Sequence, residues 1–400
     1  MSSYDTTVGM GETSFPSGRR EALILFTLLA ITVTALIGVG ALVRRFRSWQ
    51  NTLAHRMNQR GELALKAGQP KLAINFFRSS LSFNREDPAA LLNLAQSLIA
   101  ENRLDEAESY LRTLWDRQPQ DGTVNLELGR LAIRRHQPIE VLRYYHNAIY
   151  GVWSSDPIQN RISARFELIN FLLQNNSITQ AESELISMEP GLPLDSQLHT
   201  RVGQLFLGIG DFRNAESEFL QALKLDRNNE LAAAGAGKAS FRLGHYRTAI
   251  LYLDAAMAKE RHDQQTQDML ETARLVLEND PFLRSLSALE RQERILKAYR
   301  AAGTRLQACI KNKSGSDLAA SSANQAAVPL SEDLQNLSTR ERQLRAQMTP
   351  AQLMRNPELP AAAMSFVFAV EEQTDPICGE PAGLDEALLL IGRNREGVER

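Results

Sequence analysis

The sequence predicts an all-α protein with one transmembrane helix near the N-terminus, an α-solenoid of about six helix pairs and a small, partly disordered helical C-terminal region. Two observations lead to this fold class. Residues 22–43 carry no charged side chain, and residues of similar size recur every 34 positions between residues 54 and 263. A fixed period of this length is typical of repeat proteins. The apolar content of 43% is that of an ordinary globular chain.

The N-terminal region is interpreted as a polar tail (1–20), a transmembrane helix (21–43) and a basic juxtamembrane segment (44–53). As a helix, the uncharged stretch 22–43 spans about 33 Å, which matches a bilayer core of about 30 Å. A cleaved signal peptide stays open, because Gly38 and Gly40 resemble a small-x-small cleavage site. The apolar stretch is longer than that of a signal peptide, which favours an anchor.

The positive charges beside the helix predict its orientation. Two arginines precede it and a larger group follows it: Arg19 and Arg20 before, and Arg44, Arg45, Arg47, Arg56 and Arg60 after. Cytoplasmic flanks are the ones enriched in Lys and Arg. We therefore expect a single-pass protein of the cell (inner) membrane with its repeat domain in the cytoplasm, although the two arginines directly before the helix argue for the opposite side.

The 34-residue period divides the chain into six units: 54–87, 88–121, 122–155, 162–195, 196–229 and 230–263. Each unit is predicted to form two short amphipathic helices, with the turn at a residue such as Gly68, Asn102, Gly210 or Gly244. A small residue in the first helix lets the second helix approach, and a larger apolar residue in the second helix fills the space between units. The predicted structural core is Gly61, Ala73, Phe77, Ala95, Ala107, Leu111, Gly129, Val141, Tyr145, Ala181, Leu185, Gly203, Ala215, Phe219, Gly237, Ala249 and Leu253.

This pattern resembles the tetratricopeptide repeats, and the fifth unit matches it best, at Val202, Gly203, Phe206, Gly210, Phe212, Ala215, Phe219 and Ala222. The family's Trp at the fourth position is missing in every unit, and its Pro at the thirty-second occurs only as Pro119 and Pro193. The resemblance implies a right-handed superhelix with a concave groove. The chain as a whole is similar to membrane-anchored bacterial members of that family.

The resemblance also implies which positions of each first helix line the groove. The peptide-groove candidates at these positions are Asn58, Arg130, Arg134, Asn170, Gln204, Lys238 and Arg242. Arg, Lys and Asn side chains donate hydrogen bonds to carboxylates, so we expect acidic or C-terminal peptide segments as partners. A solvated helix face without a ligand stays open as the alternative.

No catalytic, cofactor-binding or metal-binding residue is predicted. The two cysteines, Cys309 and Cys378, lack metal-site spacing; they would form one disulfide in an exported protein and stay free thiols in the cytosol. The six histidines are scattered, and "GAGKAS" at 235–240 lacks the first glycine of a phosphate loop. A net charge of −2 gives no general attraction for nucleic acid. We therefore expect a protein that is not an enzyme and that has no cofactor and no nucleic-acid partner.

One aromatic cluster lies where the spacing between units stretches from 34 to 40 residues. Tyr145 belongs to the core by periodicity. Tyr150 and Trp153 are predicted to be buried in the longer turn, because large aromatic side chains are mostly buried. Whether Tyr144 and His146 meet solvent, a partner or the chain's own C-terminal segment stays open.

The region after the repeats is divided into capping and C-terminal helices (264–311), a flexible linker (312–330) and a small helical region (331–400). The predicted function is a membrane-anchored scaffold or adaptor for protein–protein interaction, in envelope assembly, secretion or quality control as the resemblance implies. The alternative is a regulatory or substrate-recruiting subunit of an enzyme complex whose activity depends on the C-terminal region. A homo-oligomer also stays open.

Overall fold

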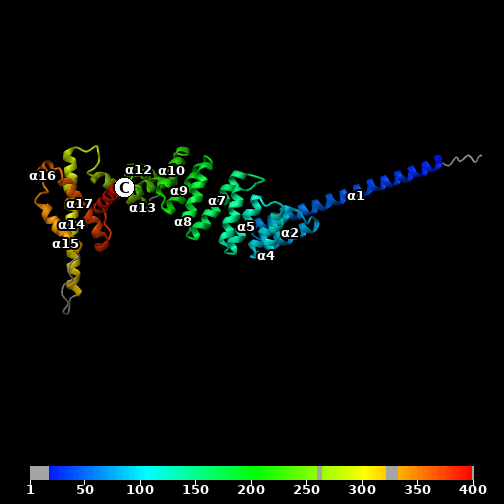
Figure 1. Cartoon of the computed structure of the whole chain (residues 1–400), viewed down its shortest axis with the longest axis horizontal. Coiled ribbons are helices and arrows are strands. Elements are labelled where there is room, and N and C mark those ends of the chain that lie inside the picture. The colour runs from blue at the N-terminus through cyan, green and yellow to red at the C-terminus, as the bar shows by residue number, and fades with distance from the viewer. Residues whose placement is uncertain (1–17, 259–263, 321–331, 399–400) are drawn as a thin grey trace, which may run out of the picture. The chain divides into compact units, whose positions relative to one another are not determined.

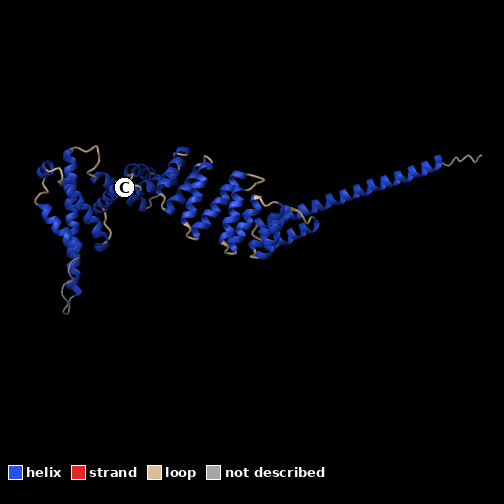
Figure 2. Cartoon of the chain, viewed as in Figure 1, coloured by secondary structure: helices blue, strands red, loops and turns tan. Residues whose placement is uncertain are grey.

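The structure, a computed structural model, describes residues 18–258, 264–320 and 332–398. Every regular element in these ranges is a helix (Figure 2), and a single β-bridge joins Asp121 to Val152. The predicted all-α fold class is confirmed. The chain divides into two compact units, Met1–Ser177 and Ile178–Arg400, which are described separately below as unit 1 and unit 2. Most of the predicted polar tail (1–17) and the linker residues 321–330 lie outside the described residues.

Unit 1 consists of a long helix followed by shorter ones. These are α1 (Gly18–Lys66), α2 (Pro70–Phe83), α3 (Pro88–Ala100), α4 (Leu104–Arg117), α5 (Gly122–Arg134), α6 (Pro138–Tyr150) and α7 (Pro157–Gln174). Aspartates cap α3 and α5, where the side chains of Asp87 and Asp121 accept hydrogen bonds from backbone N–H groups of the first turn. Proline opens α2, α3, α6 and α7, a position where its missing N–H costs nothing.

Helix α1 joins the predicted transmembrane segment, the basic segment and the first helix of the first repeat into one element (Figure 1). No proline or glycine lies between residues 41 and 60, so nothing in the sequence interrupts its hydrogen-bond ladder. Among the described residues it is the one helix long and apolar enough to cross a membrane, and its apolar window is not buried in the structure. The segment boundary predicted at residue 43 has no counterpart in the backbone, which is helical on both sides of it.

Unit 2 begins with the second helix of the fourth predicted repeat. Its elements are α8 (Ile178–Met188), the 3-10 turn η1 (Glu189–Gly191), α9 (Ser196–Ile209), α10 (Phe212–Leu225), α11 (Glu230–Arg242), α12 (Tyr246–Met257), α13 (Gln264–Asn279), α14 (Ala288–Ala320), α15 (Glu332–Arg345), α16 (Pro350–Arg355), α17 (Leu359–Cys378) and α18 (Leu384–Val398). The predicted flexible linker 312–330 needs correction, because α14 remains helical to Ala320. The Ala and Ser residues that suggested a linker are compatible with a helix, and no proline interrupts them before residue 329.

A left-handed residue makes the turn inside each helix pair. These residues are Gly68, Asn102, His136, Asn176, Gly210 and Gly244, all with φ between 56° and 85°. They lie 34 residues apart except for the 40 between His136 and Asn176, so the turns follow the period seen in the sequence. Glycine and asparagine tolerate this conformation, whereas His136 adopts it at a steric cost.

Small residues of the first helices face large residues of the second helices. A Cβ atom on Gly61 would lie 2.4 Å from the Phe77 ring, and one on Gly129 would lie 2.8 Å from the Tyr145 ring. The same relation holds in unit 2, where a Cβ on Gly203 would lie 2.9 Å from Phe219. Only glycine therefore allows the two helices of these pairs to pack this closely. The structure buries every residue that the period marks as core.

The stack within each unit has distinct inner and outer sides. Successive first helices contact one another. The contacting pairs are α1 with α3, α3 with α5, α9 with α11 and α11 with α13. No comparable contact joins the second helices α2 and α4, α4 and α6, or α10 and α12 in the described part of the chain. Helices on the inside of a curved stack lie closest together, so the first helices form the inner side of each unit.

The C-terminal helices share one hydrophobic core with α12 and α13. Tyr246, Ala273, Leu306, Phe366 and Leu388 belong to this cluster, and they come from five different helices. Residues 332–398 are therefore an integral part of unit 2. Beside this core, the Arg305 guanidinium on α14 lies 3.1 Å from the fully buried Glu371 carboxylate on α17.

Glu371 makes the stability of unit 2 dependent on pH. Burial and the neighbouring Asp385 carboxylate raise the pKa of Glu371 to about 8, against the opposing effect of Arg305. Between its usual pKa of 4.5 and about 8, the folded state holds a proton that the unfolded state releases. Rising pH therefore lowers the free energy of unfolding across this window, by up to about 1.4 kcal/mol per pH unit.

We expect Glu371→Gln, which cannot ionise, to flatten this dependence and to be more stable than the wild type at pH 8. Urea unfolding at pH 5, 6.5 and 8 measures it. Glu372→Gln, on the neighbouring and exposed side chain, is the matched control and should keep the wild-type slope. If the free energy of unfolding changed with pH equally in the wild type and in Glu371→Gln, Glu371 would not be the source of the pH dependence.

Candidate functional site

The inner face of unit 1 carries two connected groups of polar side chains. In the first group, the Asn58 amide of α1 donates to the Glu62 carboxylate at 2.9 Å. Asn93 of α3 donates to the same Glu62 oxygen at 3.2 Å and to the Asn58 carbonyl oxygen at 3.4 Å. Two successive first helices are thereby joined by hydrogen bonds across the inner face.

The second group is built around Arg130 of α5. Its guanidinium donates two hydrogen bonds to Glu167 of α7, at 2.9 and 2.5 Å, and a third to Glu127 at 2.7 Å. Gln96 of α3 donates to Glu127, and the Tyr145 hydroxyl donates to Glu167 at 3.0 Å. This group therefore links α3, α5, α6 and α7.

The electrostatics of the second group agree with a fixed ion-pair network. Hydrogen bonds to Glu167 raise the pKa of Arg130 above its usual value. Burial raises the pKa of Tyr145, and the neighbouring Glu167 carboxylate raises it further. Burial opposes ionisation of Glu167, but the hydrogen bonds from Arg130 hold its pKa below the usual range. At neutral pH Arg130 and Glu167 are therefore both charged, with their charges compensated inside the protein.

The structure revises the roles of two predicted groove residues. Asn58 is only 5% exposed and already hydrogen-bonded, and Arg130 is engaged by two carboxylates of the chain itself. Asn58 is therefore not accessible to a ligand, and three N–H groups of Arg130 are already used within the chain. The repeat pattern did not indicate these partners, because Glu127 and Glu167 each lie one residue after a position expected to line the groove. Arg134 and Asn170, on α5 and α7, are exposed.

In unit 2, the part of the inner face formed by α9 and α11 carries few acidic residues. Gln204 on α9 and Arg242 on α11 are exposed, and Lys238 is half-buried. The Arg242 guanidinium lies 4.9 Å from the centre of the Phe212 ring, a cation–π contact that restricts its position. Helix α9 has no acidic residue, and the one acidic residue of α11 is Glu230 at its first position. The face formed by α9 and α11 therefore offers positive charge and amide donors.

A separate cavity of about 310 Å³ lies among α4, α5 and α6 of unit 1. Leu128 and Leu131 contribute apolar surface to its lining. Its charged lining residues are three arginines and two glutamates, namely Arg112, Arg135, Arg143, Glu108 and Glu140. It lies beside second helices and not on the inner face, and the sequence analysis did not predict it.

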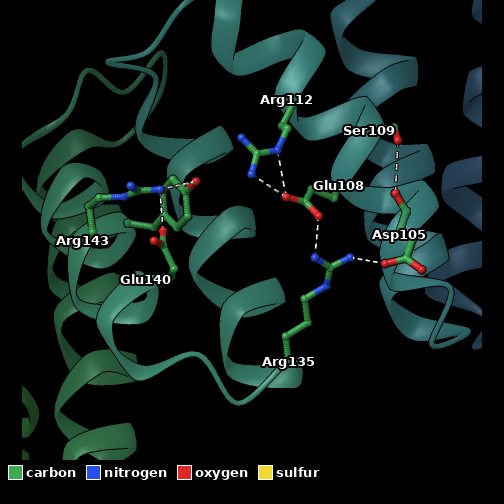
Figure 3. A network of polar contacts seen from close by, with 8 residues as sticks. Asp105, Glu108, Ser109, Arg112, Arg135, Glu140 and Arg143 are labelled. Carbon is green, nitrogen blue, oxygen red and sulfur yellow. Dashed lines mark hydrogen bonds and ion pairs between the residues drawn. The ribbon is translucent and has the colours of Figure 1, made fainter.

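Ion pairs fix the arginines of this cavity (Figure 3). Glu108 accepts from Arg112 at 2.8 Å and also pairs with Arg135, which reaches across to Asp105. Burial works against the charge of Glu108, but the hydrogen bond from Arg112 lowers its pKa overall. Because the carboxylates nearly balance the guanidinium groups, this network mainly joins α4 to α5.

The aromatic cluster is only partly as predicted. Trp153 packs against Gly122, where a Cβ would lie 2.4 Å from its ring, and its indole N–H donates to the Ala148 carbonyl at 2.9 Å. Tyr150 is 72% exposed, so its predicted burial is wrong. It is the last residue of α6 and points away from the core, where its hydroxyl accepts a hydrogen bond from Arg165. Tyr144, whose environment was open, is buried against α4 and α5.

Metal chemistry finds no support in the described ranges, where no group of three His, Cys, Asp or Glu side chains is placed to hold an ion. His199 and Glu218 form a buried pair at 2.7 Å, with one ring nitrogen of His199 lacking a hydrogen-bond partner. This pair joins α9 to α10.

Comparison with known families identifies two segments. Residues 64–137 and residues 196–229 each match a tetratricopeptide repeat model. No curated protein matches the chain.

The chain is also similar to several solved structures, including those of PilW, pilF and YrrB. PilW, a type IV pilus biogenesis factor, is 16% identical, with 55% of this chain and 99% of that chain covered and a TM-score of 0.38. The chain is 17% identical to pilF of Pseudomonas aeruginosa, with 54% of this chain and 92% of that chain covered and a TM-score of 0.32. It is 14% identical to YrrB, a protein described as having an unusual peptide-binding site. The similarity covers 53% of this chain and 88% of that chain, with a TM-score of 0.27.

Proposed function

We propose that this tetratricopeptide-repeat protein is a membrane-anchored scaffold that binds segments of partner proteins along the inner faces of its helix stacks. The observation that carries the proposal is the inner face itself, which the first helices form and which presents exposed polar side chains at regular spacing. Repeat solenoids use such extended surfaces to bind other chains. In this proposal the protein acts by binding and not by catalysis.

The membrane anchor of the proposal is the N-terminal part of α1. Its apolar side chains from Leu23 to Val43 lie in the open, which is costly in water and favourable in a bilayer. Because α1 runs without a break into the first repeat, the anchor and the first inner-face residues belong to one helix. A partner segment bound at the first repeat would then be held close to the membrane.

The charge on each inner face indicates what the bound segment contains. In unit 1 Arg130 pairs with both Glu127 and Glu167, so this group carries a net negative charge and does not favour an acidic segment. In unit 2 the donors Lys238 and Arg242 have few acidic neighbours on α9 and α11. We therefore place the acidic or C-terminal part of the partner on unit 2.

Charge reversal on the inner face tests this assignment. We expect the double variant Lys238→Glu and Arg242→Glu to lose acidic partners from the set captured by crosslinking in intact membranes. The matched control is Arg213→Glu with Arg247→Glu, two exposed arginines of the second helices α10 and α12, which changes the net charge by the same amount. If the inner-face variant kept all its partners, the proposed binding to the inner face would be wrong. The same holds if the inner-face variant and the control lost their partners equally.

The C-terminal helices belong to the proposal as a structural cap. Their buried side chains, including Phe366 and Leu388, share a core with Tyr246 of the last repeat. Removing residues 312–400 would expose that core, so such a truncation reports on folding and not on a separable activity.

A further inference from the structure

The chain's two cysteines are joined in a disulfide that ties α14 to α17. Cys309 and Cys378 are 69 residues apart in sequence, and their Cα atoms lie 5.6 Å apart. Cys309 is 2% exposed within the C-terminal core, whereas Cys378 lies at the exposed end of α17. The chain has no other cysteine.

Contacts that do not involve sulfur set the register between these two helices. Arg305, one helical turn before Cys309, donates to the Thr374 hydroxyl at 2.8 Å and to the Gly379 carbonyl at 2.9 Å. Thr374 lies one turn before Cys378, and Gly379 follows it directly. Arg305 therefore fixes α17 on both sides of Cys378 and brings the two sulfur atoms to bonding distance.

We infer that the repeats and the C-terminal helices lie on the oxidising, extracytoplasmic side of the membrane, with the N-terminal tail in the cytoplasm. Disulfides persist in the periplasm and outside the cell, and they are rare in the cytosol, where glutathione and thioredoxin keep thiols reduced. The inference rests on the membrane-anchored part of the proposed function and is independent of peptide binding.

The bond requires an oxidant, which the oxidising compartment supplies. Two thiols lose two protons and two electrons as the sulfur–sulfur bond forms. The electrons pass to the disulfide of a thiol oxidoreductase of that compartment, whose own sulfur–sulfur bond breaks to give two thiols.

The orientation expected from charge counting is the opposite one, and α1 explains why that count is weak. Arg56 and Arg60 lie in the part of α1 that packs on α2, where the Ala54 carbonyl accepts a hydrogen bond from Ser80. They belong to a folded domain, and long domains cross membranes largely regardless of their charge. The charges that still count toward orientation are Arg19 and Arg20 before the transmembrane segment and Arg44, Arg45 and Arg47 after it. The two flanks therefore differ by a single positive charge. The disulfide decides between them.

The thiol state in cells tests the inference directly. The full chain is expressed in a Gram-negative bacterium, acid-quenched, unfolded and treated with a polymer-linked maleimide. We expect no added mass without reductant and two additions after reduction. Two additions without prior reduction would overturn the inference.

Single-cysteine variants provide a second, independent readout of sidedness. In Cys309→Ser the remaining Cys378 is exposed, and we expect a membrane-impermeant maleimide to label it in intact spheroplasts. Cys378→Ser leaves the buried Cys309 and is the matched control, which should be labelled only after unfolding. Labelling of Cys309→Ser only after lysis would place the domain in the cytoplasm. Should Cys309→Ser fail to fold, the thiol state of the wild type still decides the question.

The outcomes separate this inference from the proposed function. The thiol state of the two cysteines does not depend on whether the inner-face variants lose their crosslinked partners. A cleaved leader in place of an anchor would give the same thiol result with a shorter chain, so the mass of the mature protein distinguishes the two.

Discussion

Replacing Phe219 with alanine is expected to lower the free energy of unfolding of unit 2 by about 3–5 kcal/mol. The Phe219 ring is fully buried, and glycines of two first helices face it. A Cβ on Gly203 would lie 2.9 Å from the ring, and one on Gly235 would lie 2.3 Å from it. Alanine would leave a cavity between α9, α10 and α11, which the rigid backbones on either side cannot close.

Urea unfolding, with hydrogen exchange measured over α9 to α11, gives the size and the place of this effect. Leu231→Ala is the matched control, because that side chain is 62% exposed on α11 and should change stability by less than about 0.5 kcal/mol. Exchange should accelerate first in the repeats that contact Phe219, since stability in a solenoid passes between neighbours. Equal losses in both variants would contradict the packing described.

At pH 8, where Glu371 begins to ionise in the folded wild type, replacing Arg305 with methionine is expected to cost about 1–3 kcal/mol, because it removes the cation beside the Glu371 carboxyl and a charged hydrogen-bond donor. Glu371 is fully buried 3.1 Å from the guanidinium, and Asp385 lies 3.7 Å from it. The variant also loses the hydrogen bonds to Thr374 and to the Gly379 carbonyl that hold α17 on α14.

A second substitution separates charge from packing. Adding Glu371→Gln to Arg305→Met removes the buried carboxyl that must take up a proton on folding, and it should recover part of the lost stability at pH 8. Arg300→Met, on an exposed position of the same helix, is the control and should be close to neutral. Urea unfolding of the detergent-solubilised chain measures all four proteins, and the absence of any recovery would show that charge is not the cause.

The repeat architecture could be predicted from sequence because it depends on local spacing. The turn residues Gly68, Asn102 and Gly210 mark where each pair reverses, and the small residues facing Phe77 and Phe219 mark where helices approach. Relations within one unit, such as that of Gly61 to Phe77 and of Gly203 to Phe219, recur with the period.

The inner-face chemistry was less accessible to sequence reasoning. Arg130 looked like an open donor, but its partner Glu167 lies 37 residues away on another helix. Whether two such side chains meet depends on helix rotation and on the spacing between repeats, which stretches at this junction. The exposure of Tyr150 has the same origin, since α6 ends at that residue.

The C-terminal helices could not be predicted in detail because they follow no period. Their core joins residues from Tyr246 to Ile391, and the burial of Glu371 results from that arrangement. Composition alone left the pairing of Cys309 and Cys378 open. Arg305, which sets the register of α14 on α17, carried no signal that distinguished it from the other charged residues of its helix.

Site-specific photo-crosslinking on the inner face tests the scaffold proposal most directly. A photoreactive residue is placed at Gln204 or Asn170, on first helices, and at the exposed Ser217 on the second helix α10 as the control. After irradiation of intact membranes, we predict crosslinked protein partners at Gln204 and Asn170 and none at Ser217. Adducts at Ser217 alone, or none at either inner-face position, would contradict the proposal that the inner faces bind partner proteins.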